Sequence, residues 1–214
     1  MGTGKFTKQV SGMIKLPPYQ YSVLIGLLLS DGWLTFASKT NKNARLGFKQ
    51  SLAHSAHVWF VFSILSHYCS SSPSLTSGIR ARNRFYGLQF FTRSLPCFTE
   101  LHSLFYPNGI KVIPSNIYDL LTPPAGLAHL IMGDGSVSRH GLILCTNSYS
   151  LEDIVRLMNV LMIRYRLECT IHKKRQNNKI EFMIYIRQSS VPLLRTIVIP
   201  YMHSSMLYKL GSLL

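Results

Sequence analysis

The sequence contains few acidic residues. Eight aspartates and glutamates stand against 23 lysines and arginines, which gives the 214-residue chain a formal net charge of +15. Solubility alone does not need so large an excess, and it is typical of proteins that bind a polyanion. The composition therefore indicates nucleic acid or an anionic membrane surface as partner, and its 47% of hydrophobic residues excludes a disordered tail.

Long apolar segments are also absent. The longest runs, such as residues 23–29, fall well short of the roughly 20 residues that cross a bilayer. The first twenty residues show no signal peptide, and Phe6 replaces the Ser or Thr of a myristoylation motif. The sequence therefore excludes a membrane-spanning role, and we expect nucleic acid and not a membrane as the partner.

Cysteine and metal-binding histidine patterns are missing as well. The four cysteines include no C-x-x-C pair, which argues against a zinc site or a disulfide framework, so we expect reduced thiols in the core. The histidines near one predicted helix have no Cys or acid placed to complete a metal site, so we expect them at the surface or core edge. These residues are Cys69, Cys97, Cys145, Cys169, His54, His57 and His67.

What the sequence does contain is one internal repeat. The stretch LIGLLLSDG at residues 24–32 is matched by LAHLIMGDG at residues 127–135, so that Asp31 aligns with Asp134, 103 positions later. A surface helix would distribute its charges along one face, whereas each of these segments has its acid at the end, beside a glycine. A period this long indicates a duplicated domain, because solenoid repeats have periods of roughly 20–50 residues.

The first motif is followed by alternating and helical patterns. Short strands are expected at 33–38 and 44–50, then a helix at 54–68. A hairpin at 77–93 and a helix after Pro96 complete the half.

The second motif is followed by the same order of elements. Strands are expected at 136–139 and 142–147, a helix at 151–165, a hairpin at 169–187 and a helix after Pro192. The residues expected on one face of the helix are Leu151, Ile154, Val155, Met158, Leu161 and Met162.

The predicted fold class is therefore α+β, with two αββαββα repeats related by a pseudo-twofold axis. The motif helices are expected to pack together where the repeats meet, and the antiparallel sheets are expected to form a saddle. The predicted domains are an N-terminal extension at 1–16, a first repeat at 17–106, a non-helical linker with four prolines at 107–124 and a second repeat at 125–214.

The two motifs resemble the two copies of the LAGLIDADG motif, and the chain resembles a single-chain, two-repeat LAGLIDADG homing endonuclease from about Pro17 to Leu210. The third motif position, usually small, is Gly26 in one copy and His129 in the other. The sixth position, Asp in the family name, is Leu29 and Met132, whereas the acid at the eighth position is kept in both copies.

The resemblance implies a monomer that cuts both strands of a long, non-palindromic DNA duplex by metal-dependent phosphodiester hydrolysis. It implies Asp31 and Asp134 as catalytic metal ligands, helped by the carbonyl groups of Ser30 and Gly133. Two neighbouring carboxylates repel unless a cation joins them, and their hard oxygens suit Mg²⁺. The implied cofactor is Mg²⁺ or Mn²⁺, with Ca²⁺ as a non-activating substitute.

A basic residue near the end of each repeat is also implied, and Lys111 and Lys209 fit. A lysine there could polarise the water network or neutralise charge that develops on the phosphate. Four strand-end residues are expected either to support the metal site or to contact DNA, namely Lys49 and Gln50 with their counterparts Cys145 and Asn147.

The open sheet faces are predicted to bind the duplex. Residues two apart on a strand share a face, and Arg, Lys and Gln on β-ribbons can neutralise phosphates and read base edges. In the first half we expect Arg80, Arg82 and Arg84 on one face, with Gln89, Phe91 and Arg93 outward and Leu88 and Phe90 inward. In the second half we expect Ile180, Phe182, Ile184 and Ile186 inward and Glu181, Met183, Tyr185 and Arg187 outward.

The predicted DNA-binding residues come from both halves. They are Lys39, Lys42, Arg45, Lys49, Gln50, Arg80, Arg82, Arg84, Gln89, Arg93, Arg139, Asn147, His172, Lys174, Arg175, Lys179 and Arg187.

Other functions remain open. A maturase of this fold would bind host intron RNA and assist group I intron splicing, and a non-catalytic regulator would bind DNA. Both are expected to have eroded motif acids, so the retention of both aspartates favours cleavage. The two aspartates could also have only a structural role, in which Asp-Gly ends each helix and forms the turn into the next strand. Because such enzymes are often encoded in organellar introns, the family association implies an organellar location, with the mitochondrion first.

Overall fold

The computed structural model describes residue 4 and residues 6–80, 83–176 and 179–211. Contacts divide the chain into two compact units. Unit 1 consists of Met1–Tyr21 and Asp31–Leu104, and unit 2 consists of Ser22–Ser30 and Phe105–Leu214. Most of the first motif helix therefore packs within unit 2, although it precedes the strands of unit 1 in the sequence. The domain boundaries predicted from the sequence divide the chain by repeat and not by contact, and they stay a prediction.

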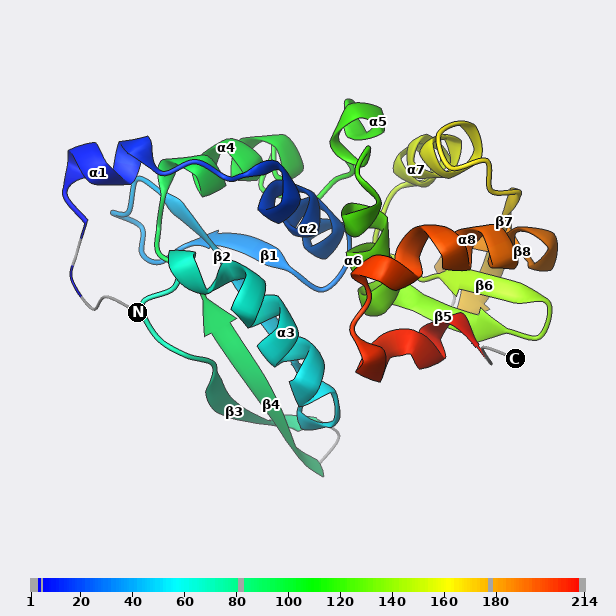
Figure 1. Ribbon diagram of the computed structural model, residues 1–214, viewed down its shortest axis with the longest axis horizontal. Coiled ribbons are helices and arrows are strands. Elements are labelled where there is room, and N and C mark those ends of the chain that lie inside the picture. The colour runs from blue at the N-terminus through cyan, green and yellow to red at the C-terminus, as the bar shows by residue number, and fades with distance from the viewer. Residues whose placement is uncertain (1–3, 5, 81–82, 177–178, 212–214) are drawn as a thin grey trace. The chain divides into compact units, whose positions relative to one another are not determined.

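Unit 1 is built on a four-stranded antiparallel sheet. Its strands are β1 (Trp33–Phe36), β2 (Ala44–Ser51), β3 (Ser74–Arg80) and β4 (Asn83–Phe91), in the order β1-β2-β4-β3. Helix α3 (Ser55–Leu65), flanked by 3-10 turns at Leu52–His54 and Ser66–Tyr68, covers one face of the sheet (Figure 1). The unit also contains α1 (Lys8–Met13) and α4 (Pro96–Phe105).

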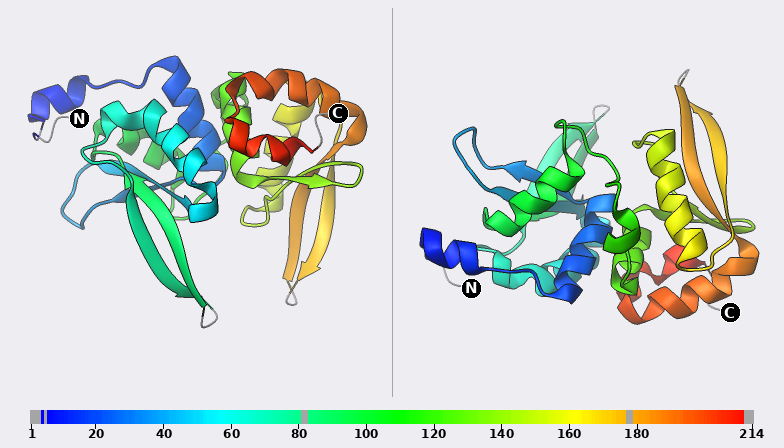
Figure 2. Two further views of the ribbon diagram at one scale, coloured as in Figure 1. Left: turned by 60° about the horizontal axis from the view of Figure 1, so that its bottom comes forward. Right: turned by 90° about the horizontal axis from the view of Figure 1, so that it is seen from above.

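Unit 2 repeats this plan. Its strands are β5 (Gly135–Ser138), β6 (Gly141–Leu144), β7 (Cys169–Gln176) and β8 (Lys179–Arg187), in the order β5-β6-β8-β7. Its helices are α5 (Ile117–Leu120), α6 (Pro124–Asp134), α7 (Leu151–Ile163) and α8 (Val191–Val198), with 3-10 segments at Gln188–Ser190, Ile199–Tyr201 and Ser204–Leu210. In each unit the long hairpin, β3–β4 or β7–β8, extends as a two-stranded ribbon (Figure 2).

The α+β class and the order of elements predicted from the sequence are confirmed. Two details are wrong. The linker contains the short helix α5, and the buried face of α7 is Asp153, Ile154, Leu157, Val160 and Leu161, while Leu151, Val155 and Met162 are exposed. Ile154 and Leu161 belong both to the face predicted from the sequence and to the observed buried face. The salt bridge from Arg156 to Asp153, at 2.9 Å, lets that carboxylate lie in the buried face.

The core of unit 1 lies between α3 and the sheet. Leu88 and Phe90 point inward as predicted, and the ring centroid of Phe62 on α3 is 5.5 Å from that of Phe90. His57, expected at the surface or core edge, is instead fully buried, with its ring 5.6 Å from Phe48. The cause is the position of His57 on the apolar face of α3 that packs on the sheet.

Three of the four cysteines are buried free thiols, as expected. Burial raises the pKa of Cys69 and Cys169 to about 12 and that of Cys97 to about 11. Thiols that stay protonated are poor nucleophiles. The prediction is wrong for Cys145, which is exposed because it follows the end of β6. Among the described residues, no helix has the length and apolarity needed to span a membrane.

Two glycines allow the motif helices α2 (Pro18–Leu29) and α6 to approach closely. A Cβ atom at Gly26 would overlap the carbonyl oxygen of Gly126 and lie 2.8 Å from Cβ of His129. A Cβ at Gly126 would lie 2.9 Å from the carbonyl oxygen of Ser22. The small residue that faces Gly26 is therefore Gly126, three positions before His129, and this explains how the second motif accommodates a histidine.

Ser22 supplies the cap that α6 lacks in its own sequence. The N-cap residue Pro123 has no side chain that can accept a hydrogen bond. The Ser22 hydroxyl accepts one from the backbone N–H of Gly126 at 2.8 Å and donates to the carbonyl of Pro123 at 3.2 Å. A side chain of one motif helix thus satisfies an amide in the first turn of the other.

We expect Gly26→Ala to destabilise the protein by about 1–3 kcal/mol, because the added methyl group has no space between the two backbones. Urea unfolding followed by circular dichroism measures this change. Gly12→Ala in α1 is the matched control, because its Cβ would meet nothing within 4 Å. A loss of stability of equal size in both variants would contradict the close approach.

Candidate active site and nucleic-acid interface

The end of α2 is held by two side chains of unit 2. The Nζ atom of Lys111 donates a hydrogen bond to the carbonyl of Ser30 at 2.9 Å, and the hydroxyl of Tyr149 donates to the carbonyl of Leu29 at 3.0 Å. The last carbonyls of a helix have no intrahelical partners. Lys111 thus satisfies the carbonyl of Ser30, the residue that directly precedes Asp31.

The end of α6 has a matching arrangement. The Nζ atom of Lys209 donates to the carbonyl of Gly133 at 2.9 Å, so this lysine lies against the residue that directly precedes Asp134. The backbone N–H of Cys145 donates to the carbonyl of Asp134 at 3.0 Å. Both lysines singled out in the sequence thus contact the corresponding position of their motif.

Asp31 has a polar partner within unit 1. The Nε2 atom of Gln50 donates to Oδ2 of Asp31 at 2.5 Å. Gln50 follows the buried Phe48 by two residues on β2, so it shares that face and points to the helix-covered side of the sheet, near the end of the strand. Gln50 is therefore placed to orient one oxygen of the exposed Asp31 carboxylate.

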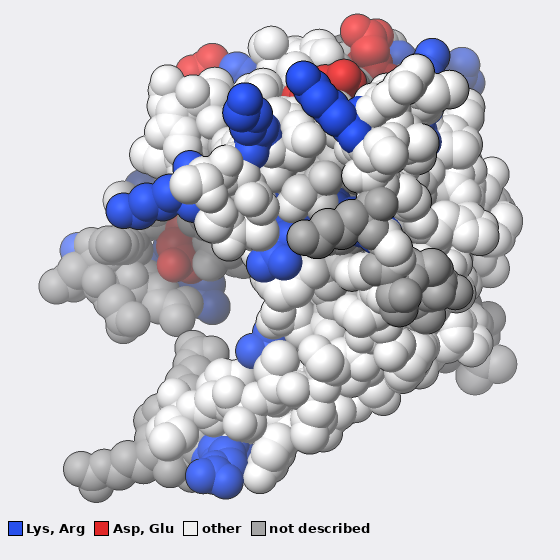
Figure 3. Space-filling model, turned by 90° about the vertical axis from the view of Figure 1, so that its left-hand side faces the viewer, with Lys and Arg blue, Asp and Glu red and all other residues white. Residues whose placement is uncertain are grey.

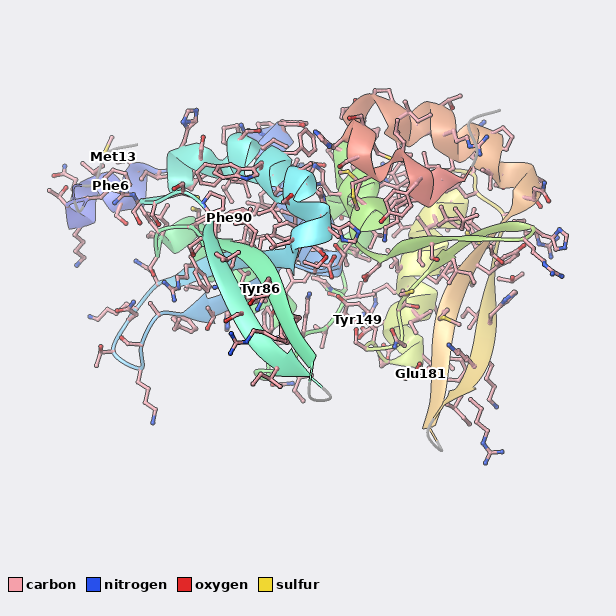
Figure 4. The ribbon with its side chains drawn as sticks, turned by 90° about the horizontal axis from the view of Figure 1, so that it is seen from below. Phe6, Met13, Tyr86, Phe90, Tyr149 and Glu181 are labelled. Carbon is pink, nitrogen blue, oxygen red and sulfur yellow. The ribbon has the colours of Figure 1, made fainter. Side chains whose placement is uncertain are left out.

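Asp134 lies in a hollow of about 330 Å³ in unit 2. The lining includes Lys209, Tyr208 and the exposed Cys145. Asn147, the expected counterpart of Gln50, donates instead to Glu181 at 3.3 Å, and Glu181 lies on β8 (Figure 4). The surroundings of the two motif aspartates therefore differ, with an amide beside Asp31 and a thiol beside Asp134.

Tyr149 was not identified from the sequence. It lies between β6 and α7 (Figure 4), where no periodic pattern marks it. Burial raises the pKa of its hydroxyl above the usual range, and the charge of Asp134 raises it further. The hydroxyl therefore stays protonated and keeps its bond to the end of α2.

The donor set fits a hydrated hard cation rather than a closed metal cage. Among the residues that the structure describes, no three His, Cys, Asp or Glu side chains are grouped to bind a metal. Asp31 and Asp134 each follow a carbonyl that already accepts a lysine ammonium, and a carbonyl oxygen has a second lone pair. Mg²⁺ keeps several waters and needs one or two carboxylates, which these residues can provide. The pairing of Asp31 in unit 1 with Asp134 in unit 2 stays a prediction.

The uncovered face of the unit 1 sheet carries part of the predicted interface. Arg45 and Lys49 alternate with buried residues on β2, and Lys49 is opposite Gln89 in the register. The expectation that Arg84 lies on the outward face is wrong, because β4 begins at Asn83 and Arg84 therefore shares the inward face of Leu88 and Phe90. Arg84 is nevertheless exposed, beyond the part of the strand that the core covers.

The uncovered face of the unit 2 sheet is less basic. His172 stacks on Tyr185 with ring centroids 4.4 Å apart, and Lys174 is opposite Glu181. Ile184 and Ile186 are buried as predicted, but Ile180 is 50% exposed near the hairpin tip, where no helix covers the strand. Arg175 is opposite Ile180 and so does not share the face of Lys174.

The remaining predicted residues lie in several settings. Arg93 is half-buried, with its guanidinium 4.5 Å from the Phe6 ring and bonded to the carbonyl of Gly4 at 2.7 Å, so it anchors the N-terminal segment. On the face drawn in Figure 3, basic side chains stand apart among uncharged ones and outnumber the acidic ones. Lys39, Lys42, Arg139 and Arg187 are exposed, Arg80 ends β3, Lys179 begins β8, and Arg82 lies outside the described residues.

Comparison with known proteins gives consistent matches. Residues 21–194 match the family described as the LAGLIDADG DNA endonuclease family. The cytochrome b mRNA maturase bI2 of Debaryomyces hansenii is 32% identical over 194 residues, with 89% of this chain and 72% of the relative covered. The maturase bI2 of Saccharomyces cerevisiae is 34% identical over 204 residues, and 90% of this chain spans only 47% of that relative.

A solved structure is also similar. The homing endonuclease I-WcaI bound to its DNA recognition sequence superposes with a TM-score of 0.84 and 26% identity, covering 97% of this chain and 94% of that one. These matches confirm the resemblance seen in the two motifs.

We expect Tyr149→Phe to lose on the order of 1–3 kcal/mol of stability at neutral pH, because buried carbonyls lose a donor. The raised pKa stabilises the fold below the unfolded value of about 10, and this contribution is lost as pH rises above it. Denaturant titrations across this range should therefore show the gap from wild type narrowing above about pH 10. Tyr86→Phe, at an exposed tyrosine, is the control and should lose less stability than Tyr149→Phe at neutral pH.

Proposed function

The chain belongs to the LAGLIDADG DNA endonuclease family, and we propose that it cuts both strands of one long, non-palindromic DNA site. One observation carries this proposal. In both halves, a lysine ammonium is hydrogen-bonded to the carbonyl directly before a motif aspartate. The carbonyls at a helix end can also be satisfied by water or by other donors, so helix termination alone does not require a lysine at the same place in both halves.

Asp31 and Asp134 would each hold a divalent cation, with the carbonyls of Ser30 and Gly133 as further ligands. Mg²⁺ or Mn²⁺ fits this hard oxygen set, and Ca²⁺ would bind without supporting cleavage. When bound, the metal supplies an activated water and stabilises the leaving oxygen of an in-line displacement at phosphorus.

The protein's own side chains have separate tasks in this proposal. Lys111 and Lys209 are hydrogen-bonded to carbonyls, and each would supply a fixed positive charge where the phosphate gains negative charge. Gln50 orients Asp31 through one carboxylate oxygen and leaves the other available. Since Asp134 has Cys145 nearby instead of an amide, the two DNA strands should be cut at different rates.

The uncovered sheet faces would bind the duplex as a monomer. Exposed basic residues on loops and ribbon ends, such as Lys42 and Arg187, would neutralise phosphates, and strand residues would reach base edges. The different residues on the two faces fit a target without palindromic symmetry.

A second candidate function is RNA maturation. Two relatives are named cytochrome b mRNA maturases. They are 32% and 34% identical to this chain, over 89% and 90% of its length. This supports host intron RNA as a second partner, and it supports an organellar, mitochondrial location. Retention of both motif aspartates makes cleavage the first candidate.

We expect Asp31→Asn and Asp134→Asn each to lower double-strand cleavage at least roughly 100-fold, because each removes a charged ligand at the reacting phosphate. The measurement is a selection from a randomised duplex library with Mg²⁺, followed by cleavage of the selected site. EDTA should abolish cutting, and Ca²⁺ should allow binding alone. Cutting by a variant with both changes at wild-type rate would contradict the assignment.

We expect Gln50→Ala to slow the cut on one strand more than on the other, because Gln50 contacts Asp31 and Asp134 lies in the other unit. Nicked plasmid should then accumulate in a supercoiled-substrate assay, by on the order of tenfold over wild type. Asn147→Ala is the matched control, since its amide contacts Glu181, and it should leave the ratio of nicked to linear product unchanged. Equal slowing of both strands by Gln50→Ala would exclude the proposed role.

Maturase activity is tested with the cleavage-deficient double variant. If it still binds a structured group I intron RNA and accelerates its splicing, the second function holds independently of cleavage. If the wild-type protein neither binds nor accelerates such RNA while it cuts DNA, the maturase candidate is rejected.

A further inference from the structure

The uncovered face of the unit 1 sheet contains a preorganised arginine. Arg45 lies on β2, one of the two inner strands, and its Cζ atom is 4.0 Å from the centroid of the Phe91 ring. This is well within the roughly 6 Å at which a cation and an aromatic ring attract. The guanidinium is therefore stacked on an aromatic surface and does not extend freely into solvent.

The aromatic surface is itself fixed by packing. Trp33, Gly47 and Phe91 form one row across β1, β2 and β4. The Trp33 and Phe91 rings meet edge to face with centroids 5.9 Å apart. A Cβ atom at Gly47 would overlap the Trp33 ring and lie 2.8 Å from the Phe91 ring, so both rings cover the glycine. We call these four residues, Trp33, Arg45, Gly47 and Phe91, the Arg45 platform.

Arg45 has donors left for a ligand. Within the described part of the chain, the side chain of Arg45 makes no hydrogen bond or salt bridge, and its Nε atom is buried without a partner. The arrangement leaves the two terminal nitrogens, which point along the plane of the guanidinium, as the groups that reach a ligand.

We propose that Arg45 reads a guanine in the half of the DNA site bound by unit 1, and that Phe91, Trp33 and Gly47 position it. The proposal rests on the proposed DNA-binding function. Two parallel in-plane donors match the O6 and N7 acceptors of guanine in the major groove. A phosphate contact needs no stacking platform, and a flexible lysine at the strand edge would serve as well.

Lys49 makes a weaker version of the same contact. Its Nζ atom is 5.4 Å from the Phe85 ring centroid, on the same uncovered face. An ammonium has no planar fork, so it lacks the bidentate geometry of arginine. The platform therefore distinguishes Arg45 from the other basic residues of this face.

The experiment is a binding selection with the cleavage-deficient double variant Asp31→Asn, Asp134→Asn on a randomised duplex library with Ca²⁺. Base preferences are then measured for this double variant, which is the parent protein of the comparison, and for Arg45→Ala, Arg45→Lys and Phe91→Leu made in it. We expect one guanine preference to fall roughly 10- to 100-fold in Arg45→Ala while other positions are unchanged.

The other two variants separate charge from geometry. Arg45→Lys keeps the charge and should keep the salt dependence of binding while it loses the guanine preference. Phe91→Leu keeps the arginine and should weaken the same preference without changing affinity for random DNA. Thermal melts test whether each variant folds. Lys42→Ala, at an exposed turn lysine, is a control that should weaken binding to all sequences equally.

Three outcomes would contradict either the inference or the proposed function. If Arg45→Ala lowers affinity for every sequence alike and reduces the salt slope by about one, Arg45 contacts a phosphate and the inference is wrong. If no preference changes in any variant, the inference is also wrong while the endonuclease proposal stands. If the parent protein selects no sequence at all, the proposed function itself fails.

Discussion

The close approach of α2 and α6 is the constraint on which the rest of the structure depends. Gly26 and Gly126 remove the side chains that would separate the two backbones, and Ser22 uses the short distance to cap α6. Because the helices cannot slide without breaking this cap, both of their C-terminal ends are fixed. A segment from the first half of the chain is thereby locked into the unit formed by the second half.

The fixed helix ends bear the same polar contact in both halves. Each end presents unpaired carbonyls, which attract a cation through hydrogen bonding and through the negative end of the helix dipole. Lys111 and Lys209 satisfy this requirement at Ser30 and Gly133. The stabilisation of a helix end and the placement of a positive charge beside a motif aspartate are therefore achieved by one interaction.

The sequence predicted the features that recur in both halves and missed those that occur once. The order of elements and the inward Leu88 and Phe90 followed from alternation and from comparing the repeats, whereas the lysines near the motif ends followed from the family resemblance. Tyr149 could not be found, because no spacing rule links a loop hydroxyl to the end of a distant helix. Likewise, the sequence shows a glycine at position 126 but not that it faces Gly26, since helix register depends on tertiary packing.

The differences between the halves follow from duplication without a requirement for symmetry. Once the helix pair and the two lysine contacts are in place, the sheet faces and the neighbours of each aspartate can change separately. Unit 1 has an amide beside Asp31 and an arginine stacked on phenylalanine, whereas unit 2 has a thiol beside Asp134 and a histidine stacked on tyrosine. A DNA duplex with different half-sites is the ligand for which such divergence is useful, because each face then needs to match only its own half.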